Sequence, residues 1–276
     1  MNELLTALGI CGRTARKVAA LAIWFGFGAS TVAAASALAV LEWYLNVGLA
    51  GTVSVVAITW LLWTVWHSLV FPRNRQRWLR ESTLLPYRRA FLVDLIPGLT
   101  VSFAQMLRPA INGPNIRAGE SALLPVGTPL LNLRAAAGGV VAVGATVLFI
   151  KAWRTLGSAR VGFVPEYVGT AAFQPLREGP YAHVRHPLFW SGIFFSCGLA
   201  VAVGTATAIA VAAANVLYGL VYNVLEDRRL RLVFGECYAS YARSVPHIIP
   251  VGLAGRQRLM SAPLVAAYHD NPAKEG

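Results

Sequence analysis

Charged side chains are scarce in this chain. Asp, Glu, Lys and Arg make up 13% of its 276 residues, whereas they make up about a quarter of an ordinary soluble domain. Hydrophobic residues account for 56% of the chain, and its mean hydropathy is +0.56. So few charged side chains cannot cover the surface of a soluble domain of this length. The composition therefore indicates a chain that is solvated largely by lipid.

Cysteine and acidic residues are also few. The three cysteines, Cys11, Cys197 and Cys237, are far apart and show neither the spacing of metal ligands nor the pattern of a disulfide framework. We therefore expect isolated thiols and no bound metal. Lys and Arg outnumber Asp and Glu by 24 to 12, which gives a net charge of +12 at pH 7. Membrane topology explains this excess better than nucleic acid does, and we expect no nucleic-acid partner.

Six stretches of the chain are apolar over roughly the 20 residues that a bilayer-spanning helix needs. They run from Val18 to Leu41, Leu49 to Phe71, Ala90 to Leu107, Arg134 to Trp153, Pro187 to Val203 and Thr205 to Leu225. The last two meet at Gly204, which leaves room only for a tight helical hairpin. The third differs from the others, because it contains Asp94 and because Pro97 and Gly98 would kink it. The sequence thus predicts an all-α, polytopic transmembrane bundle of about six spans with a C-terminal helical hairpin.

Basic residues are concentrated between alternate spans, and this pattern indicates the orientation. Lys and Arg favour the cytoplasmic loops of membrane proteins. With six spans, both termini face the cytosol, as do the dense basic clusters at the start of the chain and after the second, fourth and sixth spans. Arg108, Arg117 and Arg134 then lie on the outer side, against the rule. In the alternative, Ala90 to Leu107 is a re-entrant or interfacial helix, and another span is reassigned.

Three regions follow from this pattern. We expect residues 1–130 to form anchor helices and loops, residues 131–250 a membrane core with a cytosolic cofactor pocket, and residues 251–276 a polar tail. An interfacial belt of aromatic side chains is expected toward the cytosolic end of the second span. Its members would be Trp60, Trp63, Trp66 and His67.

The segment EGPYAHVRHPLFWSG places a dense polar cluster before the fifth span. Pro187 suits the first turn of a helix, so His186 is expected next to the helix start. A helix start presents backbone N–H groups and a partial positive charge, which suit a carboxylate or a phosphate. Arg185 is expected to bind the same group through parallel hydrogen bonds. With Tyr181 and His183 nearby, the cluster is suited to hold the anionic end of a small ligand at the membrane surface.

The segment LEDRRLRLVFGECYASYARSVP carries a second polar cluster at the end of the last span. The tight hairpin returns this end to the neighbourhood of Pro187, so Glu226 and Asp227 are expected opposite the first cluster. Their carboxylates can accept hydrogen bonds from ribose hydroxyls or from an amino group. Tyr238 and Tyr241 are three residues apart, so they share a helix face from which they could cover a pocket.

Together the two segments resemble the isoprenylcysteine carboxyl methyltransferase and phospholipid methyltransferase superfamily of membrane enzymes. The family pattern is Gly-Pro-Tyr, Arg-His-Pro and an aromatic residue, followed after a hairpin by an acidic pair, Phe-Gly-x-x-Tyr-x-x-Tyr and Val-Pro. The stretch FIKAWRTLGSARVGF is similar to the helix and turn that precede this pattern, so the resemblance covers about residues 149–250. The chain departs from the family at Phe189, where Tyr is usual, and at Asp227, where a second Glu is common.

The resemblance implies that S-adenosylmethionine binds from the cytosol between the Arg-His-Pro element and the acidic pair. The cofactor-binding residues that it implies are Tyr181, His183, Val184, Arg185, His186, Pro187, Phe189, Glu226 and Arg229. The residues expected to take part in catalysis are His186, Arg185 and Glu226. The implied reaction is methyl transfer to a lipophilic acceptor embedded among the membrane lipids. The acceptor group stays open between a carboxylate, an amine and a thiol, of which the last two would be helped by a base such as His186 or Glu226.

Two other interpretations remain. Sterol-type membrane reductases have a similar C-terminal Arg-His-rich turn and use NADPH, but they usually show Asn-Tyr after the His and an acid soon afterwards, whereas LFWSG contains neither. A non-enzymatic scaffold or transport-related protein could also keep the motif, since a fold does not fix a function. A transporter should place ionisable residues within its spans, and Asp94 is nearly the only one away from the span ends.

Overall fold

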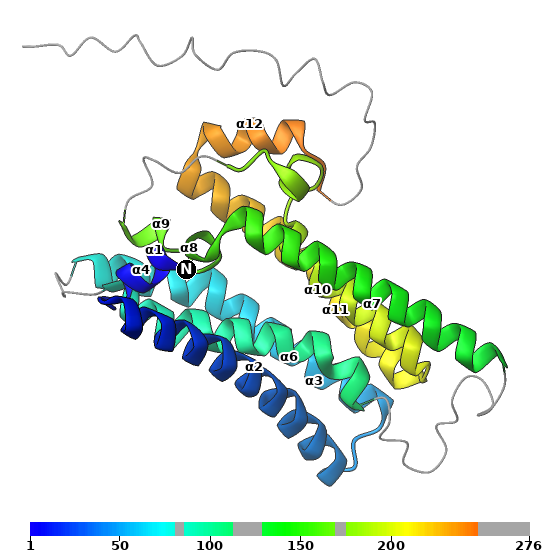
Figure 1. Cartoon of the computed structure of the whole chain (residues 1–276). Helices are drawn as coiled ribbons and strands as arrows, with labels where there is room; N and C mark the ends of the chain where they lie inside the picture. Colours follow the sequence, from blue (N-terminus) through cyan, green and yellow to red (C-terminus); the bar gives the residue numbers. More distant parts are fainter. Residues whose placement is uncertain (81–85, 113–128, 169–174, 248–276) are drawn as a thin grey trace, which may run out of the picture.

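Every element in the described part of the chain is a helix, which confirms the predicted all-α class for that part. The computed structural model describes residues 1–80, 86–112, 129–168 and 175–247. Figure 1 shows long helices that run along one another as a bundle, with the short helices gathered at one end of it. The predicted polar tail and Arg117 lie outside the described residues.

The N-terminal half contributes three long helical stretches. They are α2 (Arg13–Tyr44); α3 (Leu49–Val65) continued by the π-helical η1 (Trp66–Val70) and α4 (Phe71–Arg80); and α5 (Pro86–Ala90) continued by the π-helical η2 (Phe91–Leu95) and α6 (Ile96–Asn112). The long helices of the C-terminal half are α7 (Pro129–Leu156), α10 (Pro187–Val203) and α11 (Ala206–Phe234). The short helices are α1 (Asn2–Ala7), α8 (Ser158–Val161), α9 (Pro165–Val168), the 3₁₀ helix η3 (Gly179–Ala182) and α12 (Glu236–Ser244).

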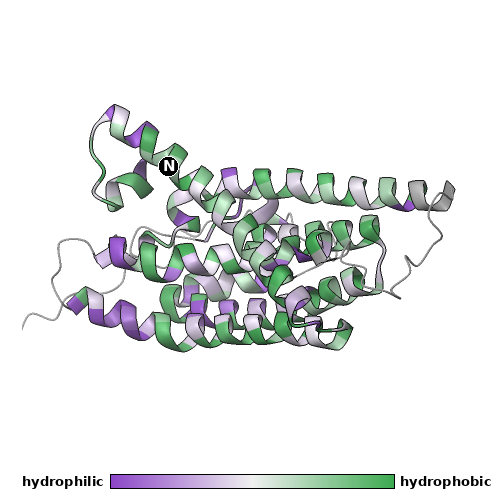
Figure 2. Cartoon of the chain, turned by 90° about the horizontal axis from the view of Figure 1, so that it is seen from below, coloured by the Kyte–Doolittle hydropathy of each residue, from purple (hydrophilic) through white to green (hydrophobic). Residues whose placement is uncertain are grey.

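In the described ranges, five helices are long and apolar enough to cross a membrane, as in a multi-pass membrane protein. They comprise Arg13–Tyr44, Leu49–Arg80, Pro86–Ile111, Leu133–Leu156 and Ala206–Phe234. The stretch around Asp94 thus belongs to a helix of spanning length. α10 is also apolar, but its 17 residues make a shorter helix of about 25 Å. Figure 2 shows hydrophobic residues along the long helices and hydrophilic residues concentrated at the end of the bundle near the N-terminus.

α7 and α10 are in direct backbone contact because both carry glycine where they meet. A Cβ atom on Gly138 would lie 2.6 Å from the carbonyl oxygen of Gly198. A Cβ atom on Gly198 would lie 2.6 Å from the backbone nitrogen of Ala142. Only hydrogen fits at these two positions, and small residues allow the same close approach at many helix pairs in membranes.

The hairpin between α10 and α11 turns at Gly204, as the sequence predicts. Gly204 has a left-handed backbone with a φ of 65°, which glycine adopts without strain. The guanidinium of Arg134, on α7, donates to the carbonyl oxygens of Val203 at 3.0 Å and Gly204 at 3.3 Å. Arg134 therefore caps the C-terminal end of α10, and this contact accounts for a basic residue on the side predicted to be external.

Arg108 is the second arginine predicted on the outer side, and it is fully buried on α6. Its guanidinium donates to Glu42 of α2 and to Gln105, while Thr52 of α3 donates to Glu42 at 3.4 Å. The charge of Arg108 is thus neutralised inside the bundle. A buried and paired arginine does not contribute to the loop charge that determines topology.

Asn215 of α11 joins four helices inside the bundle. Its side-chain oxygen accepts a hydrogen bond from Trp60 Nε1 of α3 at 2.8 Å. Its Nδ2 donates to the Gln105 carbonyl of α6 and to Ser196 Oγ of α10, both at 2.9 Å. Trp60 is 2% exposed, so the predicted interfacial belt is wrong for this residue. Its indole N–H bonds within the bundle rather than at the headgroup level.

Candidate functional site

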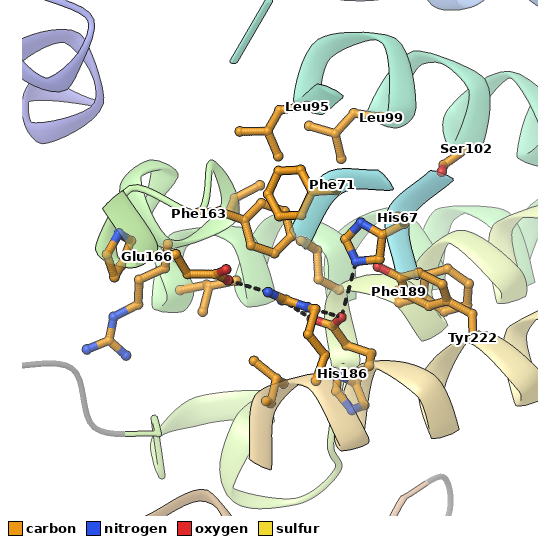
Figure 3. A pocket seen from close by; sticks show the side chains of 18 of the residues that line it. His67, Phe71, Leu95, Leu99, Ser102, Phe163, Glu166, His186, Phe189 and Tyr222 are labelled. Atoms are coloured by element: carbon orange, nitrogen blue, oxygen red, sulfur yellow. Dashed lines mark hydrogen bonds and ion pairs between the residues drawn. The ribbon is translucent and has the colours of Figure 1, made fainter. Parts of the chain in front are cut away.

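A cavity of about 290 Å³ lies where the short helices meet the bundle. Its wall is formed by η1, η2 and α6 from the N-terminal half and by α10, α11 and α12 from the C-terminal half. The volume is near the lower limit of about 300 Å³ that is typical of small-molecule sites. Figure 3 shows charged and aromatic side chains from these elements converging on the cavity.

Asp227, near the C-terminal end of α11, accepts hydrogen bonds from the segment that precedes α10 and from α12. Arg185 and Tyr238 donate to its two oxygens, and His186 Nε2 lies 2.7 Å from Oδ1. His247 is farther away, with Nε2 at 3.8 Å from Oδ2. The hairpin therefore brings the two polar segments together, as their spacing predicts.

Glu226 belongs to a row of ionisable groups that crosses the cavity. Arg229 binds it in a bidentate manner, with Nε 2.8 Å from Oε2 and Nη2 2.6 Å from Oε1. The same guanidinium donates to Glu166 of α9. On the other side, His67 Nε2 of η1 lies 3.4 Å from Glu226 Oε2. Figure 3 shows this row from Glu166 to His67, in which one arginine lies between two carboxylates.

The start of α10 offers fewer free N–H groups than the sequence suggests. His186 occupies the N-cap position with a left-handed backbone, and Pro187 has no N–H. The backbone N–H groups of Phe189 and Trp190 both donate to the carbonyl of His186, at 3.0 and 3.1 Å. Among the described residues, Leu188 carries the remaining unpaired N–H of this turn, and Leu188 lines the cavity.

α12 and the residues after it fold back over this turn. Tyr241 donates from its hydroxyl to the Tyr181 carbonyl at 3.0 Å, and the Arg185 N–H donates to the Pro246 carbonyl at 2.8 Å. Tyr238 and Tyr241 are both buried and line the cavity, so the shared face predicted for them is confirmed. Burial raises the pKa of Tyr181, Tyr238 and Tyr241, so all three stay protonated and can donate.

The structure brings some of the predicted site residues to the cavity wall and places others away from it. Those that line the cavity are Tyr181, His186, Phe189, Glu226 and Arg229. Those that do not are His183, Val184, Arg185 and Pro187. His183 is exposed, and Val184 packs against the apolar cluster around Trp190. Arg185 holds Asp227 instead of reaching into the cavity.

Phe189 lies where the resembling family usually has tyrosine. Its ring stacks on Tyr222, with centroids 4.8 Å apart and an interplanar angle of 20°. Tyr222 also lines the cavity, so the ring keeps an aromatic wall there although the hydroxyl is absent.

Tyrosines aside, four ionisable cavity residues were not predicted as site residues from the sequence: His67, Asp94, Arg160 and Glu166. His67 was expected in the interfacial belt, and this is wrong, because the residue is 6% exposed and its ring packs near Phe71 and Tyr222. Buried residues recur along this helix at Thr52, Val56, Trp60, His67 and Phe71, so His67 belongs to its inward face. The sequence carries no signal for this face, because apolar residues surround the helix on all sides.

Within the described part of the chain, three side chains are close enough to share a metal ion. The ligand atoms of His186, Asp227 and His247 all lie within 4.8 Å of one another. Asp227 already accepts from Tyr238 and from the Arg185 guanidinium, whose positive charge would repel a cation. The group is therefore better suited to holding the turn before α10 than to binding a metal.

A scan of protein-family models, a search of curated proteins and a search of solved structures each returned no match to this chain.

Proposed function

We propose that this chain is a membrane methyltransferase of the isoprenylcysteine carboxyl methyltransferase type, which uses S-adenosylmethionine to methylate a lipophilic acceptor. The observation that carries the proposal is the meeting of the two polar segments at one cavity. His186, ahead of α10, bonds to Asp227, while the adjacent Glu226 lines the cavity together with Arg229. Two motifs that are 40 residues apart, counted from His186 to Glu226, thus contribute to a single site.

The residues present fit the groups of S-adenosylmethionine. The carboxylate of Glu226 can accept from ribose hydroxyls or an amino group, and the acids of the row favour a cationic ligand. Two donors could bind the carboxylate of the cofactor: the N–H of Leu188 and the hydroxyl of Tyr181, which is buried without a partner in the described residues. When bound, the cofactor supplies an electrophilic methyl group, so the protein needs to bind and align rather than to activate a metal.

The cavity is suited to an acceptor with an apolar body. Leucine and aromatic side chains of α6 and α10 form much of its wall, among them Leu99, Phe103, Leu188 and Phe189. Contact with these side chains would stabilise an acceptor with an apolar body, because its apolar surface leaves water. The polar row then lies at the end where the acceptor meets the cofactor.

We infer that the cavity end of the bundle faces the cytosol. The first turns of α2 and the whole of α4 lie at this end of the bundle. They carry most of the basic residues of the N-terminal half, namely Arg13, Arg16, Lys17, Arg73, Arg75, Arg77 and Arg80. Basic residues favour the cytoplasmic side, where S-adenosylmethionine is made available. Both termini are proposed to lie on that side.

Binding of S-adenosylmethionine to the purified protein tests the proposal. Calorimetry on the wild type should show one site per chain, and His186→Ala and Glu226→Gln should each weaken binding at least about tenfold. Glu236→Gln is the matched control, because Glu236 is an exposed acid on α12. NADPH is titrated in parallel, and binding of NADPH without binding of S-adenosylmethionine would favour the reductase. Wild-type affinity in both cavity variants would refute the site.

A further inference from the structure

The cavity has a second polar group that the proposed cofactor site does not use. Asp94, on η2, lines the cavity and is 1% exposed. Trp66 Nε1, on η1, donates to its Oδ1 at 2.7 Å. Its other oxygen, Oδ2, is buried and has no hydrogen-bond partner in the described part of the chain.

The two π-helical segments place this carboxylate. A π-helical turn inserts an extra residue into a helix and is frequent at functional sites, because it redirects side chains at a cost in helix stability. η1 carries Trp66 and His67, and η2 carries Asp94, so both segments direct polar groups toward the same cavity wall. The Trp66–Asp94 hydrogen bond joins the two.

His67 and Tyr167 lie close enough to Asp94 to interact with its charge. The cavity wall that continues from Asp94 along η2 and α6 is mostly apolar and contains Leu95, Leu99, Ser102 and Phe103. In Figure 3, Leu95 and Leu99 lie on one side of the row from Glu166 to His67, and His186 lies on the other. Asp94 directly precedes Leu95 on η2, so it belongs to the cavity wall that the N-terminal half contributes. A buried carboxylate oxygen without a partner is costly in such a place, and ionisable groups within membrane helices usually have a ligand or a partner.

We propose that Asp94 binds an ammonium group at the end of an apolar chain, so that the acceptor is a long-chain primary amine rather than a carboxylate. The statement that this amine is the methyl acceptor rests on the proposed function, whereas the binding of an ammonium at Asp94 does not depend on it. The free Oδ2 can accept one of the three N–H bonds of an ammonium, and the apolar wall of η2 and α6 surrounds the chain. Histidines and tyrosines aside, the ionisable side chains that line the cavity are three acids and two bases: Asp94, Glu166, Glu226, Arg160 and Arg229. Arg229 pairs with Glu166 and Glu226, so the carboxylate of Asp94 is left to repel an alkyl carboxylate and to attract an ammonium.

The same carboxylate can accept the proton that an ammonium must lose before its nitrogen can be methylated. When the nitrogen gives up a proton, one N–H bond breaks, its electron pair stays on nitrogen, and an O–H bond forms at Oδ2. The result is a neutral amine with a free pair beside a neutral carboxylic acid. No further oxidant, reductant or metal is needed for this step.

Binding of dodecylamine and of dodecanoate, which share a chain length and differ in charge, tests the inference. Each is titrated by calorimetry into the full-length protein in detergent micelles, with empty micelles subtracted. The wild type should bind dodecylamine at least about tenfold more tightly than dodecanoate. Asp94→Asn should remove this preference, and Asp94→Glu, which keeps the carboxylate, should retain most of it. Glu236→Gln, which removes an exposed acid of α12, should leave it unchanged.

The outcomes separate this inference from the proposed function. Titration of S-adenosylmethionine into the same variants reports on the cofactor site alone, and Asp94→Asn should keep wild-type affinity for it. Loss of the amine preference in Asp94→Asn with intact cofactor binding supports the Asp94 site. Equal binding of the two probes by the wild type, or an undiminished amine preference in Asp94→Asn, overturns it. If Asp94→Asn does not fold, the wild-type preference and its retention in Asp94→Glu decide the question, and a Glu variant that prefers dodecanoate overturns the inference.

Discussion

His67 Nε2 lies 3.4 Å from Glu226 Oε2, although the two residues are 159 positions apart in the chain. His67 comes from the N-terminal region, which the sequence suggests is only an anchor, and Glu226 comes from the end of α11. The contact shows that the N-terminal helices form part of the cavity wall beside the acidic pair. A function of the cavity therefore depends on both halves of the chain.

Replacing His67 tests this dependence. His67→Leu keeps an apolar side chain of similar size but removes the hydrogen bond to Glu226. Since the bond is long and Arg229 still binds Glu226, we expect the free energy of unfolding to fall by only about 1 kcal/mol. Affinity for S-adenosylmethionine should fall about tenfold, because Glu226 loses one of its two positioning partners. The control is His183→Leu, an exposed histidine of the same motif as His186. Calorimetric binding that is equal in the two variants would contradict the role of His67.

The Arg185–Asp227 pair should stabilise the fold strongly, because both side chains are largely buried, at 13% and 10% exposure. Removing one partner leaves the other charge buried, so Arg185→Ala and Asp227→Ala should each cost about 3 kcal/mol. The double variant should cost less than the sum by about 1–3 kcal/mol. Unfolding in mixed micelles with rising dodecyl sulfate measures these values.

The matched control for that cycle is the Arg243–Glu236 pair. The same two kinds of group are joined there, but the side chains are 67% and 78% exposed. Water screens the attraction, so the coupling should be below about 1 kcal/mol. A coupling at Arg185–Asp227 as small as that of the exposed pair would show that burial adds nothing to it.

The glycines of α7 offer a test of helix packing in which two neighbours differ. Gly138→Ala would place its Cβ 2.4 Å from the backbone nitrogen of Ala202, so α7 and α10 must move apart. The expected cost is about 1–3 kcal/mol of unfolding free energy. Gly139→Ala meets nothing within 4 Å and should be neutral or stabilising by up to about 1 kcal/mol. Equal stabilities in mixed micelles would mean that the two backbones are not in contact.

Much of the fold follows from local properties of the sequence, but the cavity follows only in part. Each predicted apolar stretch is helical, because the length of an apolar run is read directly from neighbouring residues. The contact of His186 with Asp227 was also predictable, since a tight turn at Gly204 aligns the ends of two helices. His67 and Asp94 could not be placed in this way. The direction in which their side chains point depends on how η1 and η2 are rotated about their helix axes. This rotation is determined by packing between segments that are distant in the sequence.

Stability should depend on pH through His247. Burial lowers the pKa of His247 below its ordinary value of 6.5, His186 and Arg185 lower it further, and Asp227 opposes them. The unfolded chain therefore takes up a proton at a higher pH than the folded chain does. The contribution of His247 is complete above about pH 6.5 and is lost as the pH falls through the lower folded value.

His247→Gln removes this titration. The melting temperature of the wild type should fall relative to that of His247→Gln between pH 7 and pH 5, and the two should run parallel above pH 7. His183→Gln, which changes an exposed histidine of the turn before α10, should follow the wild type throughout. A constant difference between the wild type and His247→Gln over the whole range would remove His247 as the cause.

The proposed orientation can be tested with the natural thiols. Cys11 and Cys237 are both exposed and belong to the end of the bundle that carries α1 and α12 (Figure 1). Because basic residues favour the cytosolic side, a membrane-impermeant maleimide should label both in inverted vesicles and neither in vesicles of native orientation. A Tyr44→Cys variant in which Cys11 and Cys237 are replaced by serine serves as the control, because Tyr44 is exposed at the C-terminal end of α2. It should be labelled only in vesicles of native orientation. Labelling of Cys11 and Cys237 from opposite faces would separate the polar segments from the N-terminal basic cluster, and the cavity would then have no single cytosolic side from which S-adenosylmethionine could bind.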